Sequence, residues 1–78
     1  QVWMSHGDHV SAIAPGFVRT PILDAMRPEM LDKMVAMVPL RRLGEPEEIG
    51  RTVVFLASDE SSFINAAEIY VDGGLAQI

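Results

Sequence analysis

The stretch Val10-Ser-Ala-Ile-Ala-Pro-Gly-Phe-Val-Arg-Thr20 joins a run of small and β-branched residues to a Pro-Gly break and a polar segment. An uncharged run of this kind predicts a strand that is covered on both faces, as in parallel sheets. Pro15 has no N–H to give to a sheet, so the strand ends there. Gly16 lets another molecule approach the main chain closely. Ligands of open parallel sheets bind just beyond the carboxyl ends of strands, which makes residues 16–20 a candidate ligand loop. An ordinary strand-to-helix connection is the alternative.

The segment after Thr20 has a helical pattern. Its apolar residues recur at spacings of three and four: Ile22, Leu23, Met26, Met30, Leu31, Met34, Val35 and Val38. Pro28 interrupts the pattern, so we expect a short helix, a break, and a second helix with Pro28 in its first turn. Pro39 disfavours helical angles at Val38 and therefore ends the second helix. The flexible methionine side chains suit irregular apolar partners, such as another helix.

The second half of the chain predicts one more helix and one more strand. Residues 45–48 read Glu-Pro-Glu-Glu, a favourable helix start, because proline has the φ of a first helical position and carboxylates suit the positive end of the helix dipole. The buried stripe of this helix is expected to comprise Ile49, Val53, Leu56 and Ala57. Residues 58–62 have loop composition. The alternation in Glu68-Ile-Tyr-Val-Asp72, before a pair of glycines, predicts a strand with Ile69 and Val71 on one face.

Four segments come in the order and spacing of a known enzyme family. They are Pro15-Gly-Phe-Val-Arg-Thr20, Pro39-Leu-Arg-Arg-Leu-Gly-Glu-Pro-Glu-Glu-Ile49, Phe55-Leu-Ala-Ser-Asp59 and Tyr70-Val-Asp-Gly-Gly74. From about Met4 to Leu75 the chain resembles the carboxyl-terminal third of a short-chain dehydrogenase/reductase, most of all the bacterial acyl-carrier-protein and acetoacetyl-CoA reductase type. The resemblance implies an α/β fold, the carboxyl-terminal part of a Rossmann-like doubly wound sheet. Residues 1–78 would form one partial domain in the order strand, lid helices, helix, strand.

The resemblance also implies a cofactor site for NAD(P) at Pro15, Gly16, Val18 and Thr20. In the family, the backbone at the position of Val18 holds the nicotinamide carboxamide, and the hydroxyl at the position of Thr20 bonds the carboxamide or a phosphate oxygen. These groups orient the nicotinamide ring. The Gly-rich phosphate loop of dinucleotide folds does not occur in these 78 residues, so we expect the chain alone to bind nicotinamide nucleotides weakly or not at all.

Catalytic and metal-binding residues are not expected. The family's acid is a tyrosine followed four positions later by a lysine, whereas Tyr70, the single tyrosine, is followed by Gly74 at that spacing. His6 and His9 have no carboxylates at fitting spacing, which favours surface histidines over a metal site. The acidic and serine residues of 58–62 are consecutive on a turn and cannot converge on one site.

Comparison with the family pattern leads to two further expectations, one for residues 4–7 and one for Ala66. Met4 to Gly7 would be the last turn of a helix, with Gly7 as its left-handed cap. Ala66 stands where the family commonly has glycine, so we expect the loop that leads into the last strand to shift if the glycine serves a close backbone approach.

Composition restricts the partners. The net charge of −5 argues against nucleic acid, the apolar runs are too short to span a bilayer, and no signal-peptide pattern occurs, so we expect a soluble, cytoplasmic protein. A chain of 78 residues has a marginal core, and no cysteine is present to reinforce it.

The last strand, Glu68 to Asp72, would be an exposed edge. In the family this strand and the preceding helix pair with a second subunit, so we expect a homodimer or higher oligomer.

Two functions remain open. The chain is either a truncated or fragmentary NAD(P)-dependent oxidoreductase of carbonyl or hydroxyl groups, inactive by itself, or a small stand-alone protein derived from that family. The second would be used for self-association or for binding a partner or ligand.

Overall fold

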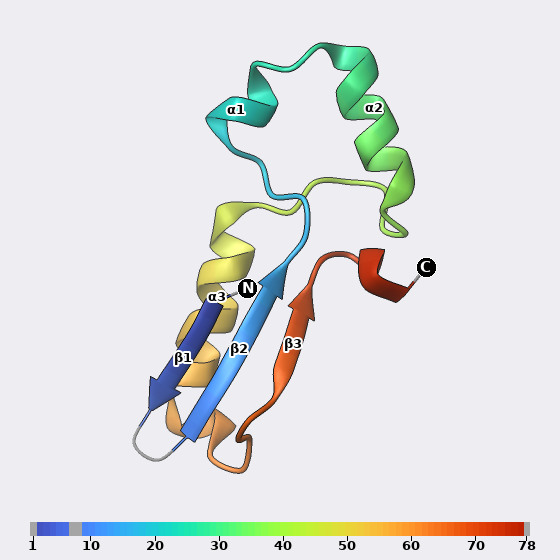
Figure 1. Cartoon of the computed structure of the whole chain (residues 1–78). Coiled ribbons are helices and arrows are strands. Elements are labelled where there is room, and N and C mark those ends of the chain that lie inside the picture. Colours follow the sequence, from blue (N-terminus) through green and yellow to red (C-terminus); the bar gives the residue numbers. More distant parts are fainter. Residues whose placement is uncertain (1, 7–8, 78) are drawn as a thin grey trace.

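The computed structural model describes residues 2–6 and 9–77, and within them a three-stranded sheet is covered on one face by a helix (Figure 1). The elements follow the chain as β1 (Val2–His6), β2 (His9–Pro15), α1 (Pro21–Asp24), α2 (Pro28–Met37), α3 (Pro46–Ala57) and β3 (Glu68–Val71). Short 3-10 turns follow α3 at Asp59–Ser61 and β3 at Leu75–Gln77. This α/β arrangement confirms the predicted fold class.

The central strand β2 is paired on both sides. It runs antiparallel to β1 and parallel to β3, with Ile13 opposite Val2 on one side and opposite Ile69 on the other. Ala12 and Ile13 are fully buried, because they lie in the middle of the sheet. Pro15 is the last residue of the strand, as predicted. The small, uncharged residues of β2 therefore form the centre of the fold.

The prediction for the amino-terminal segment is wrong. Residues 2–6 form strand β1 instead of the last turn of a helix, and the expected two-stranded sheet has three strands. The physical reason is that β2 would otherwise leave one edge without hydrogen-bond partners, and Val2 and Trp3 suit a strand. The predicted cap at Gly7 lies outside the described residues.

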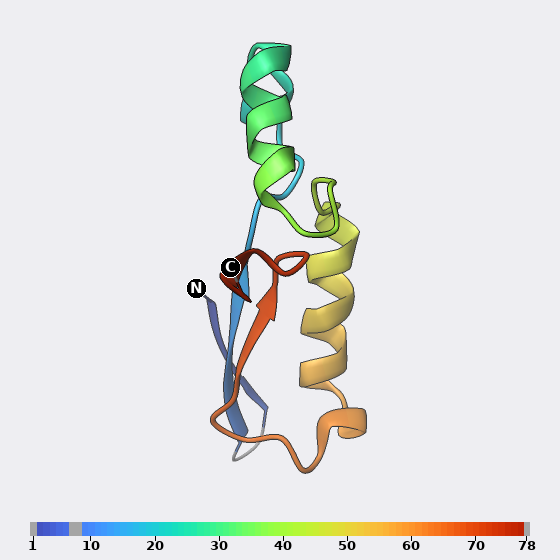
Figure 2. The same ribbon diagram turned by 90° about the vertical axis from the view of Figure 1, so that its right-hand side faces the viewer.

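Helices α1 and α2 form an arm (residues 21–37) that rises beyond the carboxyl ends of β2 and β3 (Figures 1 and 2). Their bounds confirm the predicted break, with Pro21 and Pro28 in the first turns and Val38 in extended conformation after α2. No residue of either helix is buried, and Ile22, Met30 and Met37 are exposed. Met26 and Met34 are half-buried, so only part of the methionine side chains of the arm is covered within the described residues.

Helix α3 packs against one face of the sheet (Figure 2). Leu56 is buried, and Ile49 and Val53 are half-buried, which confirms most of the predicted stripe. Ala57 is exposed, contrary to the prediction. At about 100° per residue, Ala57 lies roughly 80° around the helix from Ile49, at the margin of the stripe, and it is also the last residue of the helix.

Strand β3 follows the predicted alternation. Ile69 and Val71 are half-buried, whereas Glu68 and Tyr70 are exposed. The carbonyls of Ala67 and Val71 accept hydrogen bonds from the N–H groups of Ala12 and Gly16. Alternate residues of this segment therefore direct their backbone groups toward β2. Glu68 and Tyr70 consequently direct theirs to the outer edge of the sheet.

Ala66 has a φ of 58°, in the left-handed region that favours glycine. The departure from the family pattern therefore acts through backbone conformation. The turn is held by a hydrogen bond from the Ala66 N–H to the Val10 carbonyl and by a 2.9 Å bond from the Val10 N–H to Asn65 Oδ1. Strand β3 still pairs in register from Glu68, opposite Ala12.

We expect Ala66→Gly to raise the free energy of unfolding by about 0.5–1 kcal/mol. An L-residue loses about 1–2 kcal/mol in the left-handed region, and glycine gives back about 0.4–1 kcal/mol through its more flexible unfolded state. Ala67→Gly is the matched control, because Ala67 does not have a positive φ; it should destabilise by about 0.5–1 kcal/mol. Urea denaturation followed by circular dichroism measures both, and equal effects of the two substitutions would contradict the explanation.

Candidate functional site

The strand-end loop (residues 16–20) connects β2 to the arm at the carboxyl edge of the sheet. Val18 forms an isolated parallel bridge with Gly44, two residues before α3 begins. The Gly44 N–H donates to the Phe17 carbonyl over 2.9 Å, and the Arg19 N–H donates to the Gly44 carbonyl over 2.8 Å. Because these bonds use the groups of Phe17 and Arg19, the N–H and C=O of Val18 take no part in the bridge and have no hydrogen-bond partner in the part of the chain that the structure describes.

Gly16 is required by packing within the chain. Its N–H donates to the Val71 carbonyl, and a Cβ on Gly16 would lie 2.6 Å from the Cβ of Asp72. No side chain fits at such a separation, so only glycine allows the ends of β2 and β3 to come this close. The close approach predicted for Gly16 is therefore made by Asp72 of the same chain.

Thr20 has two functions in this loop. Its Oγ1 accepts a 3.4 Å hydrogen bond from the Leu23 N–H and thereby caps α1. A hydroxyl that accepts in this way keeps its own hydrogen, which can be donated to another acceptor. The structure thus places one exposed donor and the free backbone groups of Val18 on the same short loop, whereas Pro15 and Gly16 shape its beginning.

Asp72 and the two glycines after it form a turn beside this loop. The Asp72 carboxylate accepts from the Gly74 N–H over 2.9 Å and from the Ala76 N–H over 3.0 Å. Gly73 and Gly74 have φ values of 64° and 97°. A Cβ on Gly73 would lie 2.7 Å from Cγ1 of Val38, and the Gly73 carbonyl accepts from the Leu40 N–H. The glycine pair therefore connects β3 to the segment that follows the arm and is not a phosphate loop.

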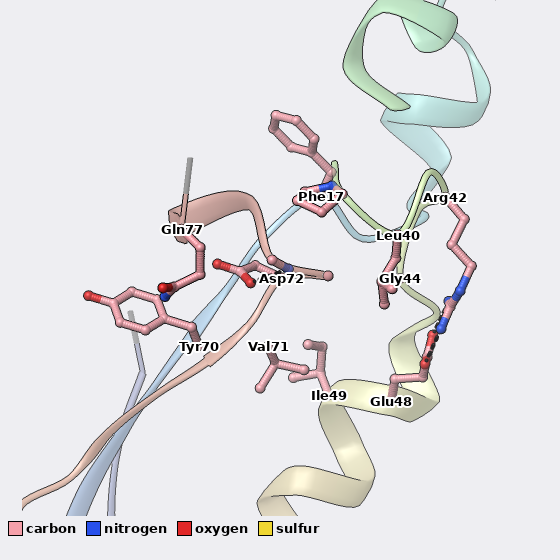
Figure 3. Close-up of a pocket in the computed structure, with 13 residues that line it drawn as sticks. Phe17, Leu40, Arg42, Gly44, Glu48, Ile49, Tyr70, Val71, Asp72 and Gln77 are labelled. Atoms are coloured by element: carbon pink, nitrogen blue, oxygen red, sulfur yellow. Dashed lines mark hydrogen bonds and ion pairs between the residues drawn. The ribbon is translucent and has the colours of Figure 1, made fainter. Parts of the chain in front are cut away.

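A cavity of about 670 Å³ lies between this turn, the first turn of α3 and the segment after the arm (Figure 3). Its apolar lining includes Phe17, Leu40, Ile49 and Val71, and its polar lining includes Arg42, Glu48, Tyr70, Asp72 and Gln77. None of the four predicted cofactor residues lines it. Sequence reasoning missed this cavity because its walls come from separate segments of the chain that only the fold brings together.

Arg42 and Glu48 form a two-pronged ion pair at the cavity wall. Nη1 and Nη2 of Arg42 donate to Oε1 and Oε2 of Glu48 over 2.8 and 2.9 Å, and Oε1 also accepts from the Glu45 N–H (Figure 3). The hydrogen bond from Arg42, with that from the Glu45 backbone, lowers the pKa of Glu48 from 4.5 to about 2. A carboxylate with so low a pKa is a poor proton acceptor, so this pair holds the helix start in place.

Tyr70 is not arranged as a proton donor. A hydrogen bond between its hydroxyl and Glu68 raises the pKa of Tyr70, and the charge of that carboxylate acts in the same direction. The tyrosine acid of the resembled family has its pKa lowered by a lysine, whereas the position four residues after Tyr70 is Gly74. The shift at Tyr70 is therefore opposite in direction to the one that the family's acid requires.

Within the described residues, no group of three or more His, Cys, Asp or Glu side chains is placed to hold a metal ion. The side chains of His6 and His9 lie outside the described part of the structure. In that part, none of the helices combines the length and apolar character that crossing a membrane requires.

A parallel strand pair that ends in a Pro-Gly loop and an Asp-Gly-Gly turn is typical of the short-chain dehydrogenases/reductases. Residues 2–76 match the model of one family of that class, described as enoyl-(acyl carrier protein) reductase, and the chain belongs to this family. This confirms the resemblance drawn from the sequence.

Similar proteins have much longer chains. Over 70 residues the chain is 41% identical to (3R)-3-hydroxyacyl-CoA dehydrogenase of Mus musculus, covering 90% of this chain and 27% of that protein. Over 66 residues it is 42% identical to 3-oxoacyl-(acyl-carrier-protein) reductase FabG of Thermotoga maritima, covering 85% and 27%. A crystal structure described as gox2181 superposes with a TM-score of 0.81 at 33% identity, covering 90% of this chain and 28% of that one. The chain thus spans about a quarter of the length of these relatives.

We expect the Arg42–Glu48 pair to make stability depend on pH. Because the pKa of Glu48 is lower in the folded state than in the unfolded state, its contribution is complete above about pH 4.5 and is lost as the pH falls toward about 2. Glu48→Gln should therefore be less stable than the parent near pH 6, and the difference should vanish near pH 2. Urea midpoints across this range measure it, with Glu47→Gln in the same helical turn as control. A difference that does not change with pH would contradict the assignment.

Proposed function

We propose that the chain is the carboxyl-terminal segment of an NAD(P)-dependent oxidoreductase that acts on a carbonyl or hydroxyl group, and that it has no activity by itself. The observation that carries the proposal is the strand-end loop, where Val18 keeps its N–H and C=O free beside the Thr20 hydroxyl. Support also comes from relatives whose names describe dehydrogenation of 3-hydroxyacyl and reduction of 3-oxoacyl compounds. A cytoplasmic location, expected from the composition, belongs to the same proposal.

The loop fits the carboxamide group of nicotinamide. A carboxamide has one acceptor oxygen and an NH2 donor, which complement the N–H and C=O of Val18, and the Thr20 hydroxyl can donate to the same oxygen or to a phosphate. When bound, a nicotinamide would donate the hydride to a carbonyl or accept it from a hydroxyl compound, and Val18 and Thr20 would orient its ring. Orientation of the reacting groups contributes a large part of catalysis, but proton transfer needs an acid that these residues do not provide.

Self-association is the second candidate function, and the outer edge of β3 favours it. The backbone groups of Glu68 and Tyr70 face away from β2, and the side chain of Tyr70 is 51% exposed. Helix α3, which covers one face of the sheet, also exposes the apolar side chains of Val54 and Phe55 to solvent. We propose that two copies pair through residues 68–72 and α3 about a two-fold axis, which would join two three-stranded sheets.

The first test of the proposal combines turnover and ligand binding. We expect no NADPH oxidation with a β-keto thioester and a dissociation constant for NADPH weaker than about 10 μM, or about −7 kcal/mol.

Reduced nicotinamide riboside, which has no phosphate, should shift the amide signals of Val18 and Thr20 at roughly millimolar concentration. Thr20→Ser keeps both the cap and the donor and should bind as the parent does. Thr20→Asp keeps the cap but loses the donor, so it should bind about threefold more weakly.

Two outcomes would contradict the assignment. One is turnover above a buffer blank in protein free of host enzymes. The other is the absence of any shift at Val18 and Thr20 at the highest concentration of the riboside.

The second test concerns the pairing of β3. We expect sedimentation to show a dimer or higher oligomer at micromolar concentration, and Val71→Asp to dissociate or unfold it, because a half-buried strand position gains a charge. Tyr70→Pro is the milder variant, since it removes an N–H directed to the outer edge and an exposed side chain but adds no charge to the strand. It should raise the dissociation constant by about tenfold or more, at about 0.5–1.5 kcal/mol for each lost hydrogen bond in the two copies. A folded monomer, with Tyr70→Pro unchanged in mass, would exclude this interface.

A further inference from the structure

Arg19 lies between Val18 and Thr20, the two residues of the strand-end loop to which the proposed function assigns the ligand, and its side chain binds other parts of the chain. Its Nε donates to Oε1 of Glu45 over 3.1 Å, and its Nη1 donates to Oδ1 of Asp24 over 3.3 Å. Glu45 is the residue before α3, and Asp24 is the last residue of α1. One guanidinium therefore connects the loop to the body of the protein and to the arm at the same time.

The backbone of Arg19 reinforces the same connection. Its N–H donates to the Gly44 carbonyl, so main chain and side chain of one residue bind two consecutive residues, Gly44 and Glu45. The planar guanidinium can direct separate N–H groups at two carboxylates, whereas an ammonium presents a single charged nitrogen. Because the arm has no buried residue, few other contacts restrain the loop from that side.

We propose that Arg19 is a positioning residue, which holds Val18 and Thr20 in the orientation that receives a nicotinamide carboxamide by binding Glu45 and Asp24 together. This inference rests on the proposed function of the strand-end loop. Arg19 itself touches no ligand in this arrangement. Its effect on binding is exerted through the conformation of its two neighbours, and through the arm that begins directly after them (Figure 1).

The ion pairs are half-exposed, with 49% of the Arg19 side chain, 47% of that of Glu45 and 56% of that of Asp24 accessible. Pairs of this kind add little to global stability and weaken in salt. Their removal should loosen the loop and leave the sheet intact. A residue with a merely structural role would instead change the protection of the whole fold.

The test is amide hydrogen exchange on the 78-residue chain, measured without ligand. In Arg19→Gln, exchange of the Gly44 N–H, which donates to Phe17, should be about three- to tenfold faster, because two exposed pairs are lost. Exchange of the Ala12 N–H, which donates to Ala67 in the sheet, should not change. Arg19→Lys keeps the charge but not the fork and should lie between the parent and Arg19→Gln. In about 1 M sodium chloride, the parent should move toward Arg19→Gln.

Arg27→Gln is the matched control. Arg27 has the same charge, is exposed, and pairs with Glu29 at 3.6 Å without reaching the loop. It should leave the exchange of Gly44 unchanged. The riboside used above should also bind about threefold more weakly to Arg19→Gln and unchanged to Arg27→Gln.

Failure of this inference is distinguishable from failure of the proposed function. Exchange of Gly44 that does not respond to Arg19→Gln, or that accelerates together with Ala12, overturns the inference without any ligand. Loss of riboside affinity in Arg27→Gln equal to that in Arg19→Gln also overturns it, since any loss of positive charge would then suffice. If the parent shows no riboside signal, the proposed function is contradicted. This measurement on the parent comes before any variant is made.

Discussion

The parallel pairing of β2 with β3 is the constraint on which the rest of the structure depends. Parallel strands end at the same edge of a sheet, so the loop after Pro15 and the turn at Asp72 must lie side by side. The two chains can do so only because Gly16 has no Cβ to collide with Asp72. Each segment that leaves this edge then pairs with the connection between α2 and α3: Phe17 pairs with Gly44, and Gly73 pairs with Leu40. A set of short backbone contacts thereby replaces an extended core.

Local sequence signals predicted the elements that are governed by local physics. Proline positions set the starts of α1, α2 and α3 and the end of β2, and the alternation in residues 68–72 identified β3 with its buried face. Strand β1 could not be found this way, because it forms to satisfy the free edge of β2, and a family pattern assigns that edge to another segment. Ala57 was wrongly assigned to the buried stripe, because periodicity alone does not show at which residue the contact between a helix and the sheet ends.

The candidate site was predicted by its sequence position more than by its chemistry. Val18 and Thr20 lie where the motif put them, yet the availability of the Val18 backbone depends on a bridge to Gly44 that no spacing rule contains. Gly16 was expected to admit a ligand, and the structure shows that it is also needed for the close approach of Asp72. The cavity and the ion pairs of Arg19 and Arg42 join residues that are remote in sequence or lie in different segments. Such contacts follow from the three-dimensional arrangement, so a single sequence does not specify them.

Arg19 and Arg42 attach the two ends of the arm to the start of the same helix, α3. Arg19 precedes the arm and binds Glu45, whereas Arg42 follows it and binds Glu48, so both connections of the arm end on the first turn of the same helix. The positive end of the α3 dipole lies at this turn. The carboxylates of Glu45 and Glu48 therefore interact favourably with the dipole as well as with the two arginines. Because no residue of the arm is buried, these polar contacts, with the backbone bonds at Gly44 and Gly73, restrain it where a hydrophobic interface would otherwise be needed. An arm that is held at its base by these contacts leaves Ile22, Met30 and Met37 exposed and available to an apolar partner.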